Sequence, residues 1–233
     1  MKIFKKIRAK IENKRNSRNI FWRALVWLKD FIFYKTYKSR NNYVVVCDSK
    51  KFMFVCVFKN ASSSLRKLAY ETDGLSWEQG EQKKISIKQS RAKKYRNYIK
   101  FAVLRDPMER FLSFYRNKIL AQDHWFKEKC QEKNIQIDSL KSFVDFAKKE
   151  IDNKMTCDLH LLPQSLYYKK SDVDYIVPIE KLSIFIKNKL KFDDDLKINS
   201  SNHIPISIGI DDAKELEKIK KLYEKDYKIR PNY

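Results

Sequence analysis

The sequence predicts an α/β fold in which a mainly parallel sheet is flanked by helices. Short apolar runs of strand length alternate with segments of helical period along most of the chain. Two of these runs, at 52–58 and 98–104, end in polar turns that lead directly into helical patterns. Strands that alternate with helices in this way are typical of a mainly parallel sheet.

The first elements predicted are a hairpin and a helix. The apolar runs at 43–47 and 52–58 flank a short polar turn, which predicts two adjacent strands. Residues 64–71 have a helical pattern, and a polar, weakly patterned stretch follows from 72 to 97.

The segment after the run at 98–104 carries several helix-start signals. Asp106 suits the N-cap, Pro107 the first helical position, and Glu109 the carboxylate position of a capping box. The apolar residues that follow share one helical face: Met108, Phe111, Leu112, Tyr115 and Ile119. The opposite, exposed face is expected to present Glu109, Arg110, Ser113 and Asn117.

Later segments continue the alternation of helix and strand. We expect a helix at 140–151, a strand at 173–179, a helix at 180–192, and a final helix from about 211 to 227. Residues 1–40 are expected to form a basic amphipathic segment that precedes a domain of residues 41–233.

The charge of the chain predicts a polyanionic partner. The net charge is +22, and residues 1–40 supply half of it, with thirteen Lys or Arg against two acids. The aromatic stretch at 20–34 is interrupted by charges and is too short to span a bilayer. Two alternatives remain for it: a helix on an anionic membrane surface, or a helix that packs on the domain.

The turn after the second predicted strand resembles a phosphate-binding loop built without glycine. Its residues are Lys59, Asn60, Ala61, Ser62, Ser63 and Ser64. A helix start offers N–H groups and a positive dipole end to an anion, and the lysine and serines add charge and donors. The chain has only three glycines and lacks both GxxxxGK[ST] and GxGxxG, so the loop suits one compact phosphate.

A second polar strand end begins at Arg105, and Ser113 lies further along the helix that follows it. Ligands of open α/β sheets bind beyond the carboxyl ends of the strands, so the two strand ends together predict a site for two phosphates of one nucleotide. The four cysteines have no metal-ligand spacing, which predicts a reducing compartment and no metal site.

These two turns resemble motifs of the sulfotransferases. FVCVFKNASSSL (54–65) is similar to the 5′-phosphosulfate loop of that family. FAVLRDPMERFLSFYRNK (101–118) is similar to its 3′-phosphate motif, with Arg105 and Ser113 eight residues apart.

Later stretches resemble the carbohydrate branch of the same family, sulfotransferase family 2. The blocks are DLHLLPQ (158–164) and VDYIVPIEKL (173–182), with a weaker echo in NSSNHIPIS (199–207). The resemblance spans roughly residues 43–190. It implies a P-loop-like three-layer fold and transfer of a sulfuryl group from 3′-phosphoadenosine 5′-phosphosulfate (PAPS) to a hydroxyl group.

On this resemblance we expect Lys59 to stabilise the charge that forms on the leaving phosphate. Backbone N–H groups of about Ala61 to Leu65 and the hydroxyls of Ser63 and Ser64 would hold the 5′-phosphate. Arg105 and Ser113 would hold the 3′-phosphate.

His160, in the DLHLLPQ block, is the expected general base, with Gln164 nearby to orient the ring or the acceptor. Some relatives have a histidine between the two phosphate motifs, and residues 66–98 contain none. Glu71, Glu78 and Glu81 therefore remain alternatives for the base.

The expected acceptor is a carbohydrate of a bacterial polysaccharide or glycolipid, and an acidic or a lipid-linked saccharide would suit the basic chain. A cytoplasmic enzyme in peripheral membrane contact through residues 1–40 would suit this acceptor. A basic nucleic-acid-binding protein is the alternative, although no nucleic-acid-binding motif is present and no nucleic acid is expected as a partner. A membrane-surface scaffold with a decayed nucleotide site is a further alternative.

Overall fold

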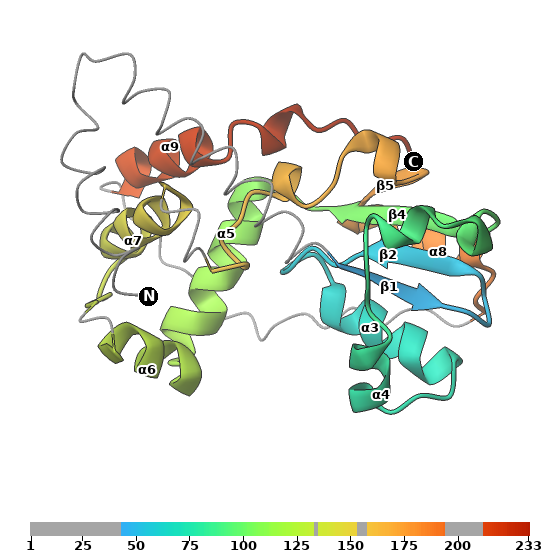
Figure 1. Ribbon diagram of the computed structural model, residues 1–233. Coiled ribbons are helices and arrows are strands. Elements are labelled where there is room, and N and C mark those ends of the chain that lie inside the picture. The colour runs from blue at the N-terminus through green and yellow to red at the C-terminus, as the bar shows by residue number, and fades with distance from the viewer. Residues whose placement is uncertain (1–42, 133–134, 153–157, 194–211) are drawn as a thin grey trace, which may run out of the picture. The chain divides into compact units, whose positions relative to one another are not determined.

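The computed structural model describes residues 43–132, 135–152, 158–193 and 212–233. Its centre is a five-stranded sheet of order β3-β1-β2-β4-β5 (Figure 1). The bounds of the strands are β1 (Tyr43–Cys47), β2 (Phe52–Val55), β3 (Ile85–Ser86), β4 (Ile99–Leu104) and β5 (Tyr175–Pro178).

Strand directions confirm the predicted α/β fold with a mainly parallel sheet. β2 runs parallel to β4, and β4 runs parallel to β5. β1 pairs antiparallel with both β2 and β3, so among the described strands only β1 runs against the others. The hairpin predicted from the two apolar runs is therefore β1 and β2.

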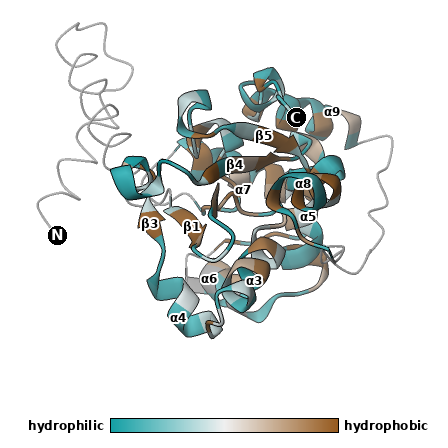
Figure 2. Cartoon of the chain, turned by 90° about the vertical axis from the view of Figure 1, so that its right-hand side faces the viewer, coloured by the Kyte–Doolittle hydropathy of each residue, from teal (hydrophilic) through white to brown (hydrophobic). Residues whose placement is uncertain are grey.

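One face of the sheet is covered by α3 (Ser62–Thr72) and α8 (Leu182–Leu190), which share a buried cluster with the strands. Phe101 of β4 connects the layers, because its ring lies 5.8 Å from that of Phe54 in β2 and 4.9 Å from that of Phe185 in α8. Figure 2 shows the strands mainly in the hydrophobic colour. This packing holds β2 and β4 side by side, so their carboxyl ends open at the same edge.

A group of helices lies beyond that edge (Figure 1). Aromatic side chains join these helices: the ring of Phe111 lies 4.9 Å from that of Phe143 and 6.1 Å from that of Tyr223. The bounds of the helices are α5 (Pro107–Tyr115), α6 (His124–Glu132), α7 (Leu140–Asp152) and α9 (Ala213–Leu222).

Most of the elements predicted from periodicity are present, with ends that differ from the predicted ones by a few residues. The strand expected at 52–58 ends at Val55, because the Val57 N–H turns back to the Val55 carbonyl. Two helices were missed: α4 (Trp77–Gln82) and α6. The sequence signal for α4 is a capping box between Ser76 and Gln79.

Short 3-10 helices connect the main elements. Their bounds are Gln89–Arg91, Lys93–Tyr95, Gln164–Leu166, Lys170–Asp172, Ile179–Lys181 and Asp226–Lys228.

The start of α5 confirms part of the prediction and corrects the rest. Asp106 accepts a hydrogen bond from the Glu109 N–H at 2.9 Å, and Pro107 is the first helical residue. The carboxylate of Glu109 lies 3.9 Å from a guanidinium nitrogen of Arg105, not on the N-cap backbone. The face expected to be exposed is wrong for Arg110 and Ser113, which are 1% and 3% exposed. Arg110 is covered because the loop after β2 packs on it through the Phe58 carbonyl.

Some predicted features lie outside the described residues. They are the N-terminal segment 1–40, the stretch 199–207 and Cys157, so the division of the chain at residue 40 stays a prediction. Of the helices that the structure describes, none has the length and apolar character to cross a membrane.

Candidate active site

A cavity of about 630 Å³ opens where α3 and α5 begin, beyond the carboxyl ends of β2 and β4. It brings together most of the site residues predicted from the sequence: Lys59, Ala61, Ser62, Ser63, Ser64, Arg105, Ser113 and His160. Its volume is in the range of small-ligand and cofactor sites.

The loop before α3 adopts a left-handed backbone without glycine. Lys59 has φ of 68° and Ala61 has φ of 57°, conformations that cost roughly 1 to 2 kcal/mol for residues with a Cβ atom. External hydrogen bonds hold this turn. The Arg105 Nη1 donates to the Lys59 carbonyl at 3.1 Å, and the Arg110 Nε donates to the Phe58 carbonyl at 3.0 Å.

A buried amide pair links this loop to the turn after β4. The Gln164 Oε1 accepts from the Asn60 Nδ2 and from the Arg105 N–H, the latter at 3.1 Å, while the Gln164 Nε2 donates to the Arg105 carbonyl at 2.8 Å. Asn60 also donates to the Val103 carbonyl at 2.7 Å. These bonds fix the Lys59 loop and the turn that begins at Arg105 relative to each other.

The amide pair changes two expectations. Gln164 has no exposed surface and its amide is used by Asn60 and Arg105, so the idea that it orients the histidine or the acceptor is wrong. The Asn60 side chain is also buried and points away from the cavity. The Asn60 side chain is therefore not expected to contact a ligand, and a contact through the Asn60 backbone stays a prediction.

The start of α3 presents its first turn to the cavity. Its N-cap, Ala61, has no side chain that could occupy the helix end, so the positive end of the helix dipole faces the cavity. The Leu65 N–H already donates to the Ala61 carbonyl at 3.0 Å, so the expected row of ligand-binding N–H groups ends before Leu65. Arg66, which the sequence reasoning missed, reaches back with its Nη2 3.4 Å from the Ser63 hydroxyl.

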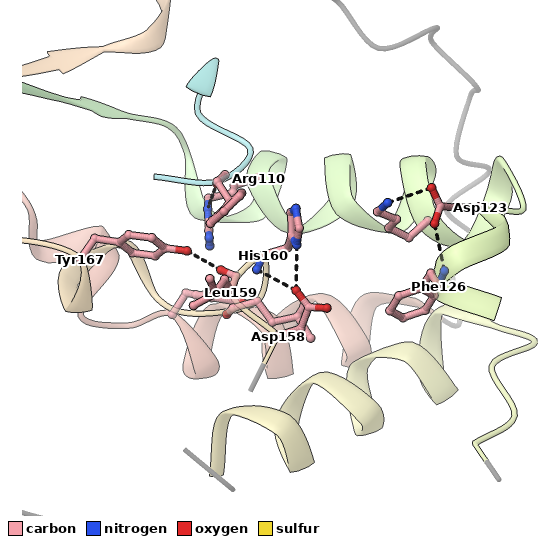
Figure 3. A network of polar contacts seen from close by, with 11 residues as sticks. Arg110, Asp123, Phe126, Asp158, Leu159, His160 and Tyr167 are labelled. Atoms are coloured by element: carbon pink, nitrogen blue, oxygen red, sulfur yellow. Dashed lines mark hydrogen bonds and ion pairs between the residues drawn. The ribbon is translucent and has the colours of Figure 1, made fainter. Parts of the chain in front are cut away.

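The opposite wall comes from α5 and from the π-helix that follows it (Arg116–Leu120). The π-helix brings Arg116, Asn117 and Lys118 to the cavity wall. No pattern in the sequence indicates a π-helix, so Arg116 and Lys118 were missed. Lys118 is held by Asp123, with 2.8 Å between Nζ and Oδ2 (Figure 3).

Burial and nearby cations disfavour the charged form of Lys59. Burial is the largest cause, and together with the positive charges of Arg105, Lys118 and Arg110 it lowers the pKa of Lys59 to about 8. Burial likewise lowers the pKa of Arg105. A bound anion would offset this unfavourable environment, as expected for a phosphate site.

His160 is held with one ring nitrogen on a carboxylate. Its Nδ1 lies 2.8 Å from the Asp158 Oδ1, and its backbone N–H donates to the same oxygen (Figure 3). Because a carboxylate accepts hydrogen bonds, this contact favours the neutral tautomer with the proton on Nδ1 and the lone pair on Nε2. The ring stacks on Phe114 at 5.3 Å and packs against Phe58 at 4.6 Å.

The segment that carries His160 is itself anchored. The Tyr167 hydroxyl donates to the Leu159 carbonyl (Figure 3), and the Tyr223 hydroxyl donates to the Leu161 carbonyl at 2.8 Å. Asp158 was missed in the sequence, although its place two residues before the histidine was visible. The geometry suits a general base with an oriented imidazole.

The alternative bases lie elsewhere. Glu71, Glu78 and Glu81 belong to α3 and α4, and none of them lines the cavity. Glu81 is engaged by Arg66 and by the Tyr70 hydroxyl, each at 3.0 Å. Among the residues that the structure describes, the carboxylates that line the cavity are Glu109 and Glu180.

Comparison with known proteins identifies the family. Residues 42–229 match the sequence model of the sulfotransferase family. Searches of curated proteins and of solved structures give no significant match. Since the match covers most of the chain and includes every predicted site residue, the chain belongs to the sulfotransferase family, whose members transfer a sulfuryl group to an acceptor substrate.

Proposed function

We propose that this protein is a PAPS-dependent O-sulfotransferase that acts on a hydroxyl group of a carbohydrate. The single observation that carries the proposal is the convergence of three groups on one cavity: the Lys59 loop, Arg105 with Ser113, and His160. These groups correspond to two phosphate subsites and a base.

The residues present fit the donor that the family generally uses. Lys59 and the start of α3 suit the 5′-phosphosulfate, because a helix start and a nearby cation favour one compact anion. Arg105 and Ser113 suit the 3′-phosphate on the other wall. When bound, PAPS supplies the sulfuryl group that is transferred.

The remaining chemistry is assigned to the residues of the chain. Lys59 would offset the negative charge of the 5′-phosphate that leaves when the donor gives up its sulfuryl group. His160 takes the proton of the acceptor hydroxyl at Nε2 while the new oxygen–sulfur bond forms. Asp158 keeps the imidazole in the required tautomer and balances the charge that it gains.

The acceptor and the cellular location are proposed from charge and composition. The cavity wall is mainly cationic, with Arg66, Arg116 and Lys118 in addition to the predicted residues, which favours an acidic or lipid-linked saccharide. We place the reaction in a bacterial cytoplasm, with residues 1–40 contacting the inner face of the membrane through their thirteen basic residues. Flotation of the full chain with anionic and with neutral vesicles tests that contact.

The proposed donor site is tested by ligand-induced stabilisation. Adenosine 3′,5′-bisphosphate, ATP and 5′-AMP are compared by their effect on Tm. A ligand at 100 times its Kd adds about 2.7 kcal/mol to the free energy of unfolding. We expect a larger Tm shift with the bisphosphate than with the others. An equal shift with ATP would instead indicate generic anion binding and favour the nucleic-acid alternative.

A further inference from the structure

Arg110 is a buried arginine below the cavity that the proposed chemistry does not use. Its side chain comes from the second turn of α5 and is 1% exposed. The Nε donates to the Phe58 carbonyl at 3.0 Å, and the Nη2 has no hydrogen-bond partner among the described residues. A buried guanidinium with an unused donor is costly, so its presence calls for a compensating role.

The contact with Phe58 lies at a strained place in the backbone. Phe58 directly precedes Lys59, whose φ is 68°, and the same turn contains Ala61 with φ of 57°. A hydrogen bond on the Phe58 carbonyl restricts the orientation of the peptide that joins Phe58 to Lys59. Arg110 therefore holds the loop from below while Arg105 holds the Lys59 carbonyl from the side.

The charge of Arg110 is also unbalanced, unlike that of the other arginines at the cavity. Arg66 is paired with Glu81, and Arg105 and Arg116 lie near Glu109. Within the described part of the chain, neither Arg110 nor Lys59 has an acidic partner. Two cations without counter-ions at one loop make the site favourable for an anion.

We propose that Arg110 is a positioning residue that holds the glycine-free loop from beneath and keeps a positive charge there, so that Lys59 is preorganised for an anion. The inference rests on the proposed function only in taking this anion to be the 5′-phosphosulfate of the donor. Arg110 itself touches neither the donor nor the acceptor, because it does not line the cavity.

The first test needs no nucleotide. Competitive labelling of lysines with acetic anhydride, read by mass spectrometry, follows the protonation of Lys59 as the pH changes. The charged and titratable groups around Lys59 in the described part of the chain are Arg66, Arg105, Arg110, Arg116, Lys118 and His160, with Glu109 and Glu180 on the cavity wall. Only Arg110 changes between the variants Arg110→Met and Arg110→Lys.

In the wild type, the pH dependence of Lys59 labelling is expected to have its midpoint at about pH 8. Arg110→Met should raise that midpoint by roughly a few tenths of a pH unit, because it removes the smallest of the four contributions that together lower the pKa of Lys59. Arg110→Lys keeps the positive charge, so its midpoint for Lys59 labelling should stay near that of the wild type. Arg96→Met is the matched control, since Arg96 is exposed and precedes the opposite end of β4. An unchanged midpoint in Arg110→Met, or an equal shift in Arg96→Met, would overturn the inference.

The second test separates the two phosphate subsites. Arg110→Met should weaken binding of 5′-AMP at least about tenfold and leave binding of 3′-AMP nearly unchanged. Equal losses for both ligands would mean a general structural defect and would contradict the proposal. If Arg110→Met does not fold, Arg110→Lys replaces it in this test, and we expect a smaller loss of affinity that is confined to 5′-AMP. A wild type that binds neither nucleotide would refute the proposed function, while the labelling result would still decide the role of Arg110.

Discussion

The buried amide of Gln164 connects the two turns of the site, and Gln164→Leu removes that connection with little change in side-chain volume. The substitution deletes hydrogen bonds to the Asn60 Nδ2, the Arg105 N–H and the Arg105 carbonyl. Each such bond contributes about 1 kcal/mol net, and a buried polar group left without a partner costs a further 1 to 3 kcal/mol, roughly. We therefore expect the free energy of unfolding to fall by about 3 to 5 kcal/mol.

Urea unfolding followed by circular dichroism measures this loss, provided that the m-value stays the same. Gln164→Glu is the informative partner variant, because it can still accept from the Arg105 N–H but cannot donate to the Arg105 carbonyl. Gln131→Leu, at an exposed position of α6, controls for the polarity change. A loss below about 1 kcal/mol in Gln164→Leu would refute the reasoning that these bonds hold the two turns together.

The remaining predictions concern the chemistry of the site. His160→Ala should lower kcat at least about tenfold with little change in binding of the bisphosphate, and wild-type turnover in this variant would exclude His160 as the base. Asp158→Asn should also lower kcat, because the imidazole loses the carboxylate that sets its tautomer. Bisphosphate binding should weaken as the pH rises above about 8, because the pKa of Lys59 is lowered to that value and its charged form binds phosphate. Calorimetry above that pH should also detect proton uptake on binding. A bisphosphate affinity that stays constant from pH 7 to about 9.5 would contradict the role of Lys59 in phosphate binding. Arg105→Lys should weaken binding of the bisphosphate more than binding of 5′-AMP, since the 3′-phosphate loses its guanidinium partner and the Lys59 carbonyl loses a hydrogen-bond donor. Equal losses of affinity for the two ligands would argue against a role of Arg105 at the 3′-phosphate.

Periodicity and turn signals were sufficient for most of the fold. The hairpin, the strand before Arg105 and the cap at Asp106 were predictable because each depends on neighbouring residues. The same signals failed for the exposed face of α5. A helical wheel assigns Arg110 to the polar side, but the loop after β2 covers that side in the folded chain.

Within the site, local motifs marked the Lys59 loop and the Arg105 turn, because a strand end that leads into a helix start is a pattern of adjacent residues. The left-handed backbone of Lys59 and Ala61 was not predictable in this way. It depends on donors from Arg105 and Arg110, which lie more than forty positions further along the chain. The choice among the candidate bases likewise depends on distances in space, since His160 lines the cavity and Glu71, Glu78 and Glu81 do not.

The sequence alone was enough to identify the fold class and to nominate the Lys59 loop, the Arg105 turn and His160 as site candidates, because short-range periodicity, helix capping and residue type carry that information. The tertiary structure decided how these parts act together: Gln164 and Asn60 join the turns, Asp158 orients His160, and burial lowers the pKa of Lys59 to about 8. Each of these effects depends on contacts, burial or electrostatic fields that exist only after folding has brought separate segments together. Hydrogen-bond partners and local dielectric are properties of three-dimensional proximity, and residue order does not specify them directly.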